Sequence, residues 1–289
     1  MSELPRIHVG DWFSDVVDWA DENLAFALDF VDSVIDSSVT GISDLFDAVP
    51  AVGLAVILSV LGLALRGWRF GLFSILGLLL VQSMRLWDPA MDSLALIIVA
   101  SICAMGIALP LGVLAARSDR ASQVVRPAMD LMQTMPAFVY LIPALFFFSI
   151  GIVPGVMATI VFAMPPGVRL TELGLRQVDR EMVEAGHAFG AHPWQILSRV
   201  QIPLAMPTIM AGVNQVIMLA LSMVVIAGMV GAGGLGAVVY EGVTRLQLSR
   251  GFEGGLAVVI LAVYLDRLTG SLSDRSAVAR AERRTAGAI

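Results

Sequence analysis

Long stretches without a charged side chain restrict the fold of this chain more than any other feature. The two longest, Leu131–Val168 and Val200–Tyr240, contain 38 and 41 residues. About 20 apolar residues are enough for one helix to cross a bilayer. The whole chain is 57% hydrophobic and 15% charged, with a mean hydropathy of +0.84. This composition predicts an all-α integral membrane protein rather than a soluble one.

The uncharged runs predict a polytopic bundle of about seven transmembrane helices. Leu131–Val168 is long enough for two spans, with Gly151 and Pro154 at the turn between them. The expected spans are 48–65, 70–84, 93–116, two within 131–168, 204–230 and 254–265. We divide the chain into an acidic N-terminal segment (1–47), a transmembrane hairpin (48–91), a main membrane domain (92–272) and an Arg-rich tail (273–289).

The N-terminal segment differs from the rest of the chain in charge. Residues 1–47 contain eleven acidic side chains and one basic side chain, Arg6. The acids recur at roughly helical spacing opposite an apolar stripe, which predicts an amphipathic helix. An acidic face is unsuited to anionic lipid. We expect this helix to lie on the outer surface or against the domain; a dedicated regulatory segment is the alternative.

The arginines predict the orientation, because cytoplasmic loops are enriched in basic residues. With the N-terminus outside, fourteen of the 18 arginines fall on the cytoplasmic side. The four outside are Arg6, Arg85, Arg245 and Arg250. We therefore expect an external Ser37, a cytoplasmic loop at 179–203 and a cytoplasmic C-terminus that includes Thr285.

The 179–203 loop has the pattern of two short helices joined by a turn. Glu181–Phe189 predicts the first, and Gly190 supplies the permissive backbone that ends it. Pro193 suits a first helical position, so Pro193–Val200 predicts the second helix. Pro203 and Pro207 are expected to separate it from the next apolar run.

This loop resembles the EAA loop of binding-protein-dependent ABC importer permeases, with the pattern E-A-A-x(3)-G-x(9)-I-x-L-P. Four residues match the pattern: Glu184, Ala185, Gly190 and Pro203. Val200 and Ile202 are aliphatic equivalents, and Gly186 is the one departure, because it replaces the second alanine. Glycine in place of the second alanine costs an isolated helix up to about 1 kcal/mol. The resemblance implies docking into a groove of an ATP-binding subunit; an ordinary hairpin is the alternative.

Longer stretches of residues 92–272 look closest to the glycine betaine/proline betaine/choline branch of these permeases. They are Met129–Tyr140, Pro165–Thr171, Met210–Gln215, Ala220–Ala227, Gly255–Ala262 and Asp266–Thr269. The resemblance implies a type I transmembrane domain in a bacterial inner membrane, importing a quaternary ammonium osmolyte. It also implies a homodimer in membrane lipid, a cytoplasmic ATPase that binds ATP and Mg, and an extracytoplasmic substrate-binding protein. Uptake of another small polar solute, such as an amino acid, is the alternative.

Several other classes of protein are disfavoured. The chain has no lysine, so it lacks the residue that a P-loop places on phosphate. Gly231–Gly236 fits G-x-G-x-x-G but follows a membrane span, so we interpret it as a re-entrant or loop segment. The histidines lie outside the spans, and a single cysteine, Cys103, forms no intrachain disulfide. We expect no catalysis, no metal, no nucleic acid and no ion coupling through charges within a span.

Polar residues within apolar spans often line a transport path. The candidates are Gln133, Thr134, Tyr140, Asn214, Gln215 and Ser222. Interhelical hydrogen bonding is an equal alternative for the amides and hydroxyls. Tyr140 and Phe146–Phe148 carry aromatic faces of the kind that bind quaternary ammonium groups, although packing is the more frequent role of such rings.

Overall fold

The computed structural model describes residues 9–274, and the regular structure within that range is entirely helical, as predicted. From residue 275 on, the expected Arg-rich tail and Thr285 lie outside the described residues. The elements are α1 (Val9–Asp47), α2 (Ala51–Arg66), α3 (Trp68–Ser83), α4 (Trp87–Arg117), α5 (Asp119–Thr134), η1 (Ala137–Tyr140), α6 (Leu141–Phe148), α7 (Ile152–Arg176), α8 (Arg180–Ala188), α9 (Pro193–Ile196), the π-helical turn η2 (Leu197–Gln201), α10 (Ile202–Met229), α11 (Gly234–Thr244) and α12 (Leu248–Asp274).

Four helices between residues 9 and 274 are long and apolar enough to cross a membrane: α4, α7, Pro193–Met229 and most of α12. Two further spans are possible if α1 with α2, and α5 with α6, each count as one bent span. Helix α3 is apolar but has only 16 residues. The expected seven apolar segments are thus helical, but fewer than seven are unbroken spans.

The first half of Leu131–Val168 is not the straight span that we expected. Helix α5 begins at Asp119, and α5 and α6 meet at an angle of 108°. Pro136 explains the break, because the residue before a proline is driven to extended backbone, and Met135 has ψ 135°. Helix α6 has 8 residues, about 12 Å, which is too short to cross alone.

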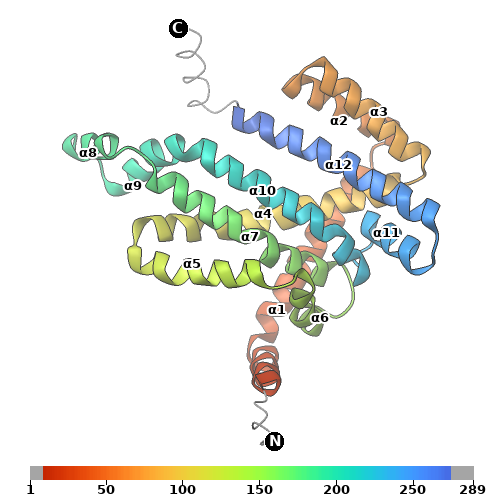
Figure 1. Ribbon diagram of the computed structural model, residues 1–289, viewed down its shortest axis with the longest axis horizontal. Helices are drawn as coiled ribbons and strands as arrows, with labels where there is room; N and C mark the ends of the chain where they lie inside the picture. The colour runs from red at the N-terminus through yellow and green to blue at the C-terminus, as the bar shows by residue number, and fades with distance from the viewer. Residues whose placement is uncertain (1–8, 275–289) are drawn as a thin grey trace, which may run out of the picture.

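Helix α7 lies at the centre of the bundle, between α4 and α10 (Figure 1). Small residues let these helices approach closely, as is common in membranes. A methyl group added at Gly112 of α4 would lie 2.5 Å from Thr171 Cβ of α7. One added at Gly174 of α7 would lie 3.0 Å from Thr208 Cβ of α10. These three helices therefore form one closely packed unit.

The glycines of 231–236 serve a helix turn. Gly231 and Gly233 have φ of +91° and +73°, and the short helix α11 follows. A methyl group at Gly228 of α10 would lie 2.2 Å from the carbonyl carbon of Gly236, so α11 packs directly on α10. The Leu235 N–H donates to Ser93 Oγ of α4 (2.8 Å). The turn agrees with the loop that the sequence suggested, whereas the helix that follows it was not predicted.

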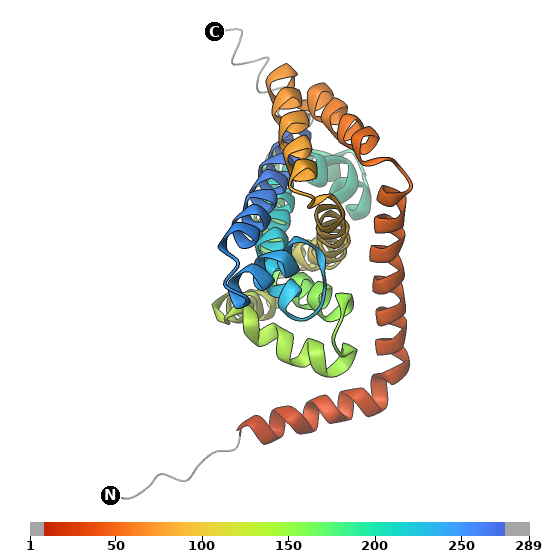
Figure 2. The same cartoon turned by 90° about the vertical axis from the view of Figure 1, so that its right-hand side faces the viewer.

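The acidic segment forms the predicted helix, α1, which bends and runs along the outside of the bundle (Figure 2). It contacts α4, α6 and α7. Val17, Ile35 and Val39 are buried against the domain, and Ser43 Oγ donates to Asp92 Oδ1 (2.6 Å). This placement agrees with the expectation of a helix packed on the domain.

Candidate functional site

The 179–203 loop begins with α8, which projects from one end of the bundle together with α9 (Figure 1). We call this the α8 end. Asp179 caps the helix by accepting a hydrogen bond from the Glu181 N–H (3.0 Å). At its C-terminus, Gly190 has φ +74°, the Gly190 N–H donates to the His187 carbonyl (2.9 Å) and the Ala191 N–H to the Gly186 carbonyl (3.1 Å). These two bonds form a Schellman motif, which confirms the turn expected at Gly190.

Helix α9 begins at Pro193, as expected, and the structure adds a cap that the sequence interpretation missed. His192 Nδ1 accepts from the Trp194 N–H (3.3 Å), and Gln195 Oε1 accepts from the His192 N–H (3.0 Å). This is a capping box, for which His-Pro-x-Gln is the local signal. The two caps fix the angle between α8 and α9.

The second helix does not end before Pro203, contrary to the expectation. Pro193–Met229 forms one continuous helical segment that joins the loop to α10. At η2 the Ile202 N–H donates to the Leu197 carbonyl, five residues back. The wider π turn leaves room for the ring of Pro203, which lies in the first turn of α10. The second half of the loop is therefore continuous with a helix long and apolar enough to cross a membrane.

Gly186, the departure from the EAA pattern, lies where α8 packs on α9. A methyl group added there would be 3.1 Å from Cγ1 of Ile196, a buried side chain. Glycine therefore allows α8 and α9 to approach closely, and this contact offsets the low helix propensity of glycine. Sequence spacing alone gave no sign of this contact.

The outer surface of the loop is exposed. No residue of α8 is buried, and Glu184 and Ala185 are exposed. Apolar side chains are exposed beside them, with Phe189 at 91% and Trp194 at 63%. Val200 and Ile202 are half-buried, while Pro203 is exposed. A projecting helix pair with exposed aromatic anchors has the form of a docking element.

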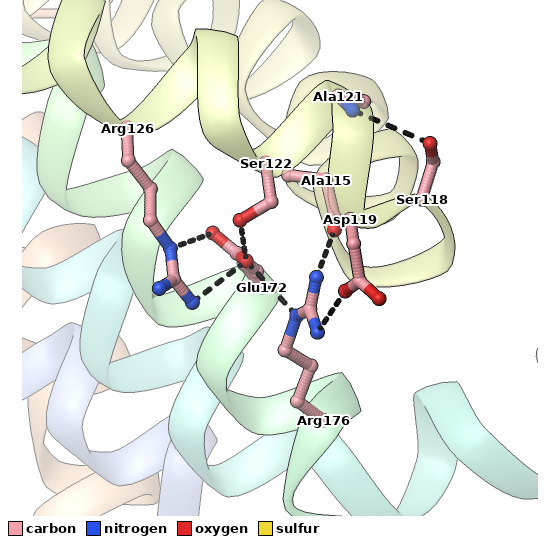
Figure 3. Close-up of polar contacts among 8 residues, drawn as sticks. All are labelled: Ala115, Ser118, Asp119, Ala121, Ser122, Arg126, Glu172 and Arg176. Atoms are coloured by element: carbon pink, nitrogen blue, oxygen red, sulfur yellow. Dashed lines mark hydrogen bonds and ion pairs between the residues drawn. The ribbon is translucent and has the colours of Figure 1, made fainter.

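A buried carboxylate lies in the last turns of α7, close to where the loop begins (Figure 3). The Glu172 side chain is 3% exposed. Its Oε1 accepts from Ser122 Oγ (2.8 Å) and Arg126 Nη2 (2.9 Å) of α5 and from Arg176 Nε (2.9 Å) of α7. Arg126 Nε also donates to Oε2 (3.2 Å). The carboxylate thus joins α5 to α7.

Arg176 extends this cluster to α4. Its Nη1 donates to Asp119 Oδ1 at the start of α5 (2.9 Å), and its Nη2 donates to the Ala115 carbonyl of α4 (2.8 Å). Further along the same α5–α7 contact, Arg169 pairs with Asp130. We call the contacts made by Glu172, Arg176 and Arg169 the α5–α7 polar seam.

The sequence interpretation missed the seam because it left residues 117–130 outside the expected spans and ended the second span of 131–168 at Val168. Helix α7 continues to Arg176, so Glu172 is buried in a part of the chain that was not expected to belong to the span. A local signal was present in the i, i+4 pair of Glu172 and Arg176. The partners on α5, however, are about 50 residues away in the chain.

Four of the six path candidates are exposed on this chain: Gln133, Thr134, Gln215 and Ser222. Thr134 and Ser222 bond to backbone carbonyls within their own helices, at 2.9 Å and 3.0 Å. Their place in a path stays a prediction.

The other two candidates have structural partners. Asn214 Nδ2 donates to Asp266 Oδ1 of α12 (3.1 Å), and Thr269 Oγ1 donates to Asn214 Oδ1. This favours interhelical bonding for Asn214. The Tyr140 hydroxyl donates to the Met132 carbonyl, and its buried ring packs beside Phe162 with centroids 6.3 Å apart. Tyr140 therefore holds the α5–α6 bend together.

The fold and the exposed helix pair between α7 and α10 define a polytopic α-helical membrane permease. Residues 108–277, more than half of the chain, match the family described as binding-protein-dependent transport system inner membrane component. The chain belongs to this family. The matched range overlaps most of the main membrane domain expected from the sequence, 92–272.

Curated relatives match almost the whole chain. It is 44% identical over 272 residues to the glycine betaine transport system permease protein OpuAB of Bacillus subtilis, covering 94% of this chain and 96% of that protein. It is 45% identical to the glycine betaine/carnitine transport permease protein GbuB of Listeria monocytogenes, covering 96% and 99%. It is 43% identical to the glycine betaine/proline betaine transport system permease protein ProW of Escherichia coli, covering 96% and 78%.

Among solved structures, the chain is similar to an inward-facing conformation of the MetNI methionine ABC transporter. The TM-score is 0.60 at 23% identity, covering 65% of this chain and 94% of that chain. At this identity the likeness concerns the fold alone. It confirms the predicted fold of a type I ABC importer transmembrane domain.

Proposed function

We propose that this chain is the permease subunit of an ATP-driven importer for a compact betaine, such as glycine betaine or proline betaine. The observation that carries the proposal is similarity at 43–45% identity over nearly the whole chain to permeases named for these solutes. An amino acid as solute is less well supported, because the methionine transporter shares 23% identity.

The 179–203 loop is the proposed docking site for a separate ATPase, which binds ATP and Mg. Phe189 and Trp194 offer exposed apolar anchors, and Glu184 offers a charge beside them. The Schellman turn and the capping box hold these anchors in a fixed relation, so that they reach their pockets together. The permease itself is proposed to be non-catalytic, and to work as a homodimer with an extracytoplasmic substrate-binding protein.

The proposed orientation places the α8 end in the cytoplasm and the N-terminus outside. Arg176, Arg180 and Arg199 lie at or beside the 179–203 loop. Arg66 Nε donates to the Arg267 carbonyl (3.2 Å), so the basic ends of α2 and α12 lie together. Both observations agree with the gathering of basic residues on the cytoplasmic side of a membrane protein.

ATP is required for accumulation because a betaine zwitterion has no net charge. The membrane potential contributes about 2.3 kcal/mol per elementary charge per 100 mV, and so contributes nothing for this solute. A cation such as choline would gain that contribution.

The proposal is tested with the complete system in proteoliposomes that contain ATP. We expect labelled glycine betaine to accumulate only with ATP and the binding protein present. An excess of unlabelled proline betaine should compete, and a neutral amino acid should not. Accumulation of the amino acid without uptake of betaine would replace the proposed solute class.

A further inference from the structure

We propose that Glu172 is a positioning residue that makes α5 follow the movement of the α8–α9 pair. This inference rests on the proposed function. It starts from how the loop is attached. Since no residue of α8 is buried, the loop reaches the bundle through the end of α7 and through the start of α10.

The two attachments differ in chemistry. At the start of α10, the apolar side chains of Leu197, Ala205 and Ile209 pack with Leu175. At the end of α7, Gly174 and Leu175 also pack on α10, whereas the hydrogen bonds to α5 are those of Glu172 and Arg176. A displacement of α8 that tilts the last turn of α7 therefore reaches α5 through the polar cluster.

Helix α5 has little apolar attachment that could replace this cluster. Of its 16 residues only Ser122 and Met129 are buried. Ser122 and Arg126 both donate to Glu172, and Asp119 accepts from Arg176. At the loop end of α5, its position relative to α7 is therefore set mainly by one carboxylate and the arginine beside it, while the Arg169–Asp130 pair and the buried Met129 hold the helix further along.

The position of α5 relative to α7 matters for function because of the polar residues at the end of α5. The helix ends at Gln133 and Thr134, two exposed polar residues, and then bends through η1, held by the Tyr140 hydroxyl on the Met132 carbonyl. If α5 moves with α7, a shift of the loop is delivered to this polar end. Without Glu172 the loop still moves, but α5 is no longer obliged to follow.

The test uses the complete transporter in proteoliposomes and measures betaine uptake and ATP hydrolysis in the same vesicles, per inserted permease. Glu172→Gln keeps the shape of the side chain and removes its charge. We expect hydrolysis to continue while the ratio of uptake to hydrolysis falls about tenfold, within the range typical of coupling between sites. A purely structural role would lower the amount of permease and leave the ratio unchanged.

Glu241→Gln on α11 is the matched control. It makes the same chemical change in an exposed ion pair, with Arg245 at 3.7 Å, remote from the seam. Its ratio should equal that of the unchanged protein. Arg126→Gln removes the α5 partner of Glu172, and the substituted position is exposed. This variant tests the inference if Glu172→Gln does not insert into the membrane. We expect it to lower the ratio by a smaller factor.

An unchanged ratio in Arg126→Gln, or in an inserted Glu172→Gln, overturns the inference. The double variant should be no worse than Glu172→Gln alone, because both changes break the same link; additive losses would also overturn it. Absence of ATP-driven betaine uptake by the unchanged complex would instead overturn the proposed function.

Discussion

Helix α7 contacts its neighbours in two different ways. Toward α4 and α10 it uses small residues and close contact, as at Gly112 against Thr171 and at Gly174 against Thr208. Toward α5 it uses the α5–α7 polar seam, with Glu172 at its centre. The first contact fits in one relative position only, because a shift brings larger side chains against each other.

The polar seam is less restrictive. An arginine side chain is long, and an ion pair weakens gradually with distance, so the seam keeps α5 attached to α7 through small shifts that close packing would not allow. Helices in lipid have little hydrophobic drive to associate, so the type of contact decides which parts move together. The comparison teaches that α4, α7 and α10 form one closely packed unit and that α5 is tied to this unit mainly by the charged contacts of the seam.

The largest effect is expected from Gly112→Leu, which breaks the close contact. Its side chain would meet Thr171 and the Val168 carbonyl, where even a methyl group lies at 2.5 Å and 2.8 Å. Overpacking costs about 1–3 kcal/mol or more, so we expect little folded permease. Thermal unfolding in detergent measures this. Gly106→Leu, on an exposed part of α4 with open space, is the control; equal stability of the two variants would contradict the packing comparison.

Gly190→Val should abolish uptake and weaken ATPase binding while the permease inserts normally. The native φ of +74° costs an ordinary L-residue about 1–2 kcal/mol, and a β-branched one more. The turn would open and misdirect α9. ATPase pull-down and uptake, per inserted permease, measure this. Asparagine adopts this backbone conformation more readily, so Gly190→Asn should keep function. Glu184→Ala should lower uptake less than Gly190→Val does. Normal ATPase binding and transport in the valine variant would remove the coupling role of the loop.

Asn214→Leu tests a polar contact outside the seam. It removes the bonds to Asp266 and Thr269, and such interhelical bonds contribute about 0.6 kcal/mol, rarely above 1.7. We expect a small loss of thermal stability and an unchanged KM for betaine. Gln215→Leu, at the exposed neighbouring position, should instead raise KM if it lines the path. A raised KM with unchanged stability for Asn214→Leu would return Asn214 to the path.

Gly186→Ala should have the smallest effect. Alanine gains up to about 1 kcal/mol in helix propensity, and this offsets the crowding of Ile196 Cγ1 at 3.1 Å. We expect uptake to stay within about twofold of the unchanged protein, because the two effects nearly cancel. Uptake and thermal unfolding of the variant measure this. Ile196→Val added to it removes Cδ1, the next-nearest atom at 3.3 Å, and should relieve part of the crowding. A loss as large as that of Gly190→Val would show that the α8–α9 contact is as restrictive as those of α7.

The sequence by itself determined the features whose causes are local. Uncharged runs gave the membrane class, since apolar residues need no particular partner in lipid. Gly190 and Pro193 marked the helix pair, because turns and helix starts depend on residues a few positions apart. Their type and spacing also supported the resemblance to the family.

Tertiary structure decided the features that depend on distant partners. Most of α5 lay outside the expected spans, and only the contacts of Arg126 and Ser122 with Glu172 of α7 show how this segment is held. For Asn214 the sequence left a transport path and interhelical bonding as equal alternatives, and only the contacts with Asp266 and Thr269 of α12 favour the second. A buried polar group must find a partner, but the sequence does not say which one, because the fold brings together residues far apart in the chain.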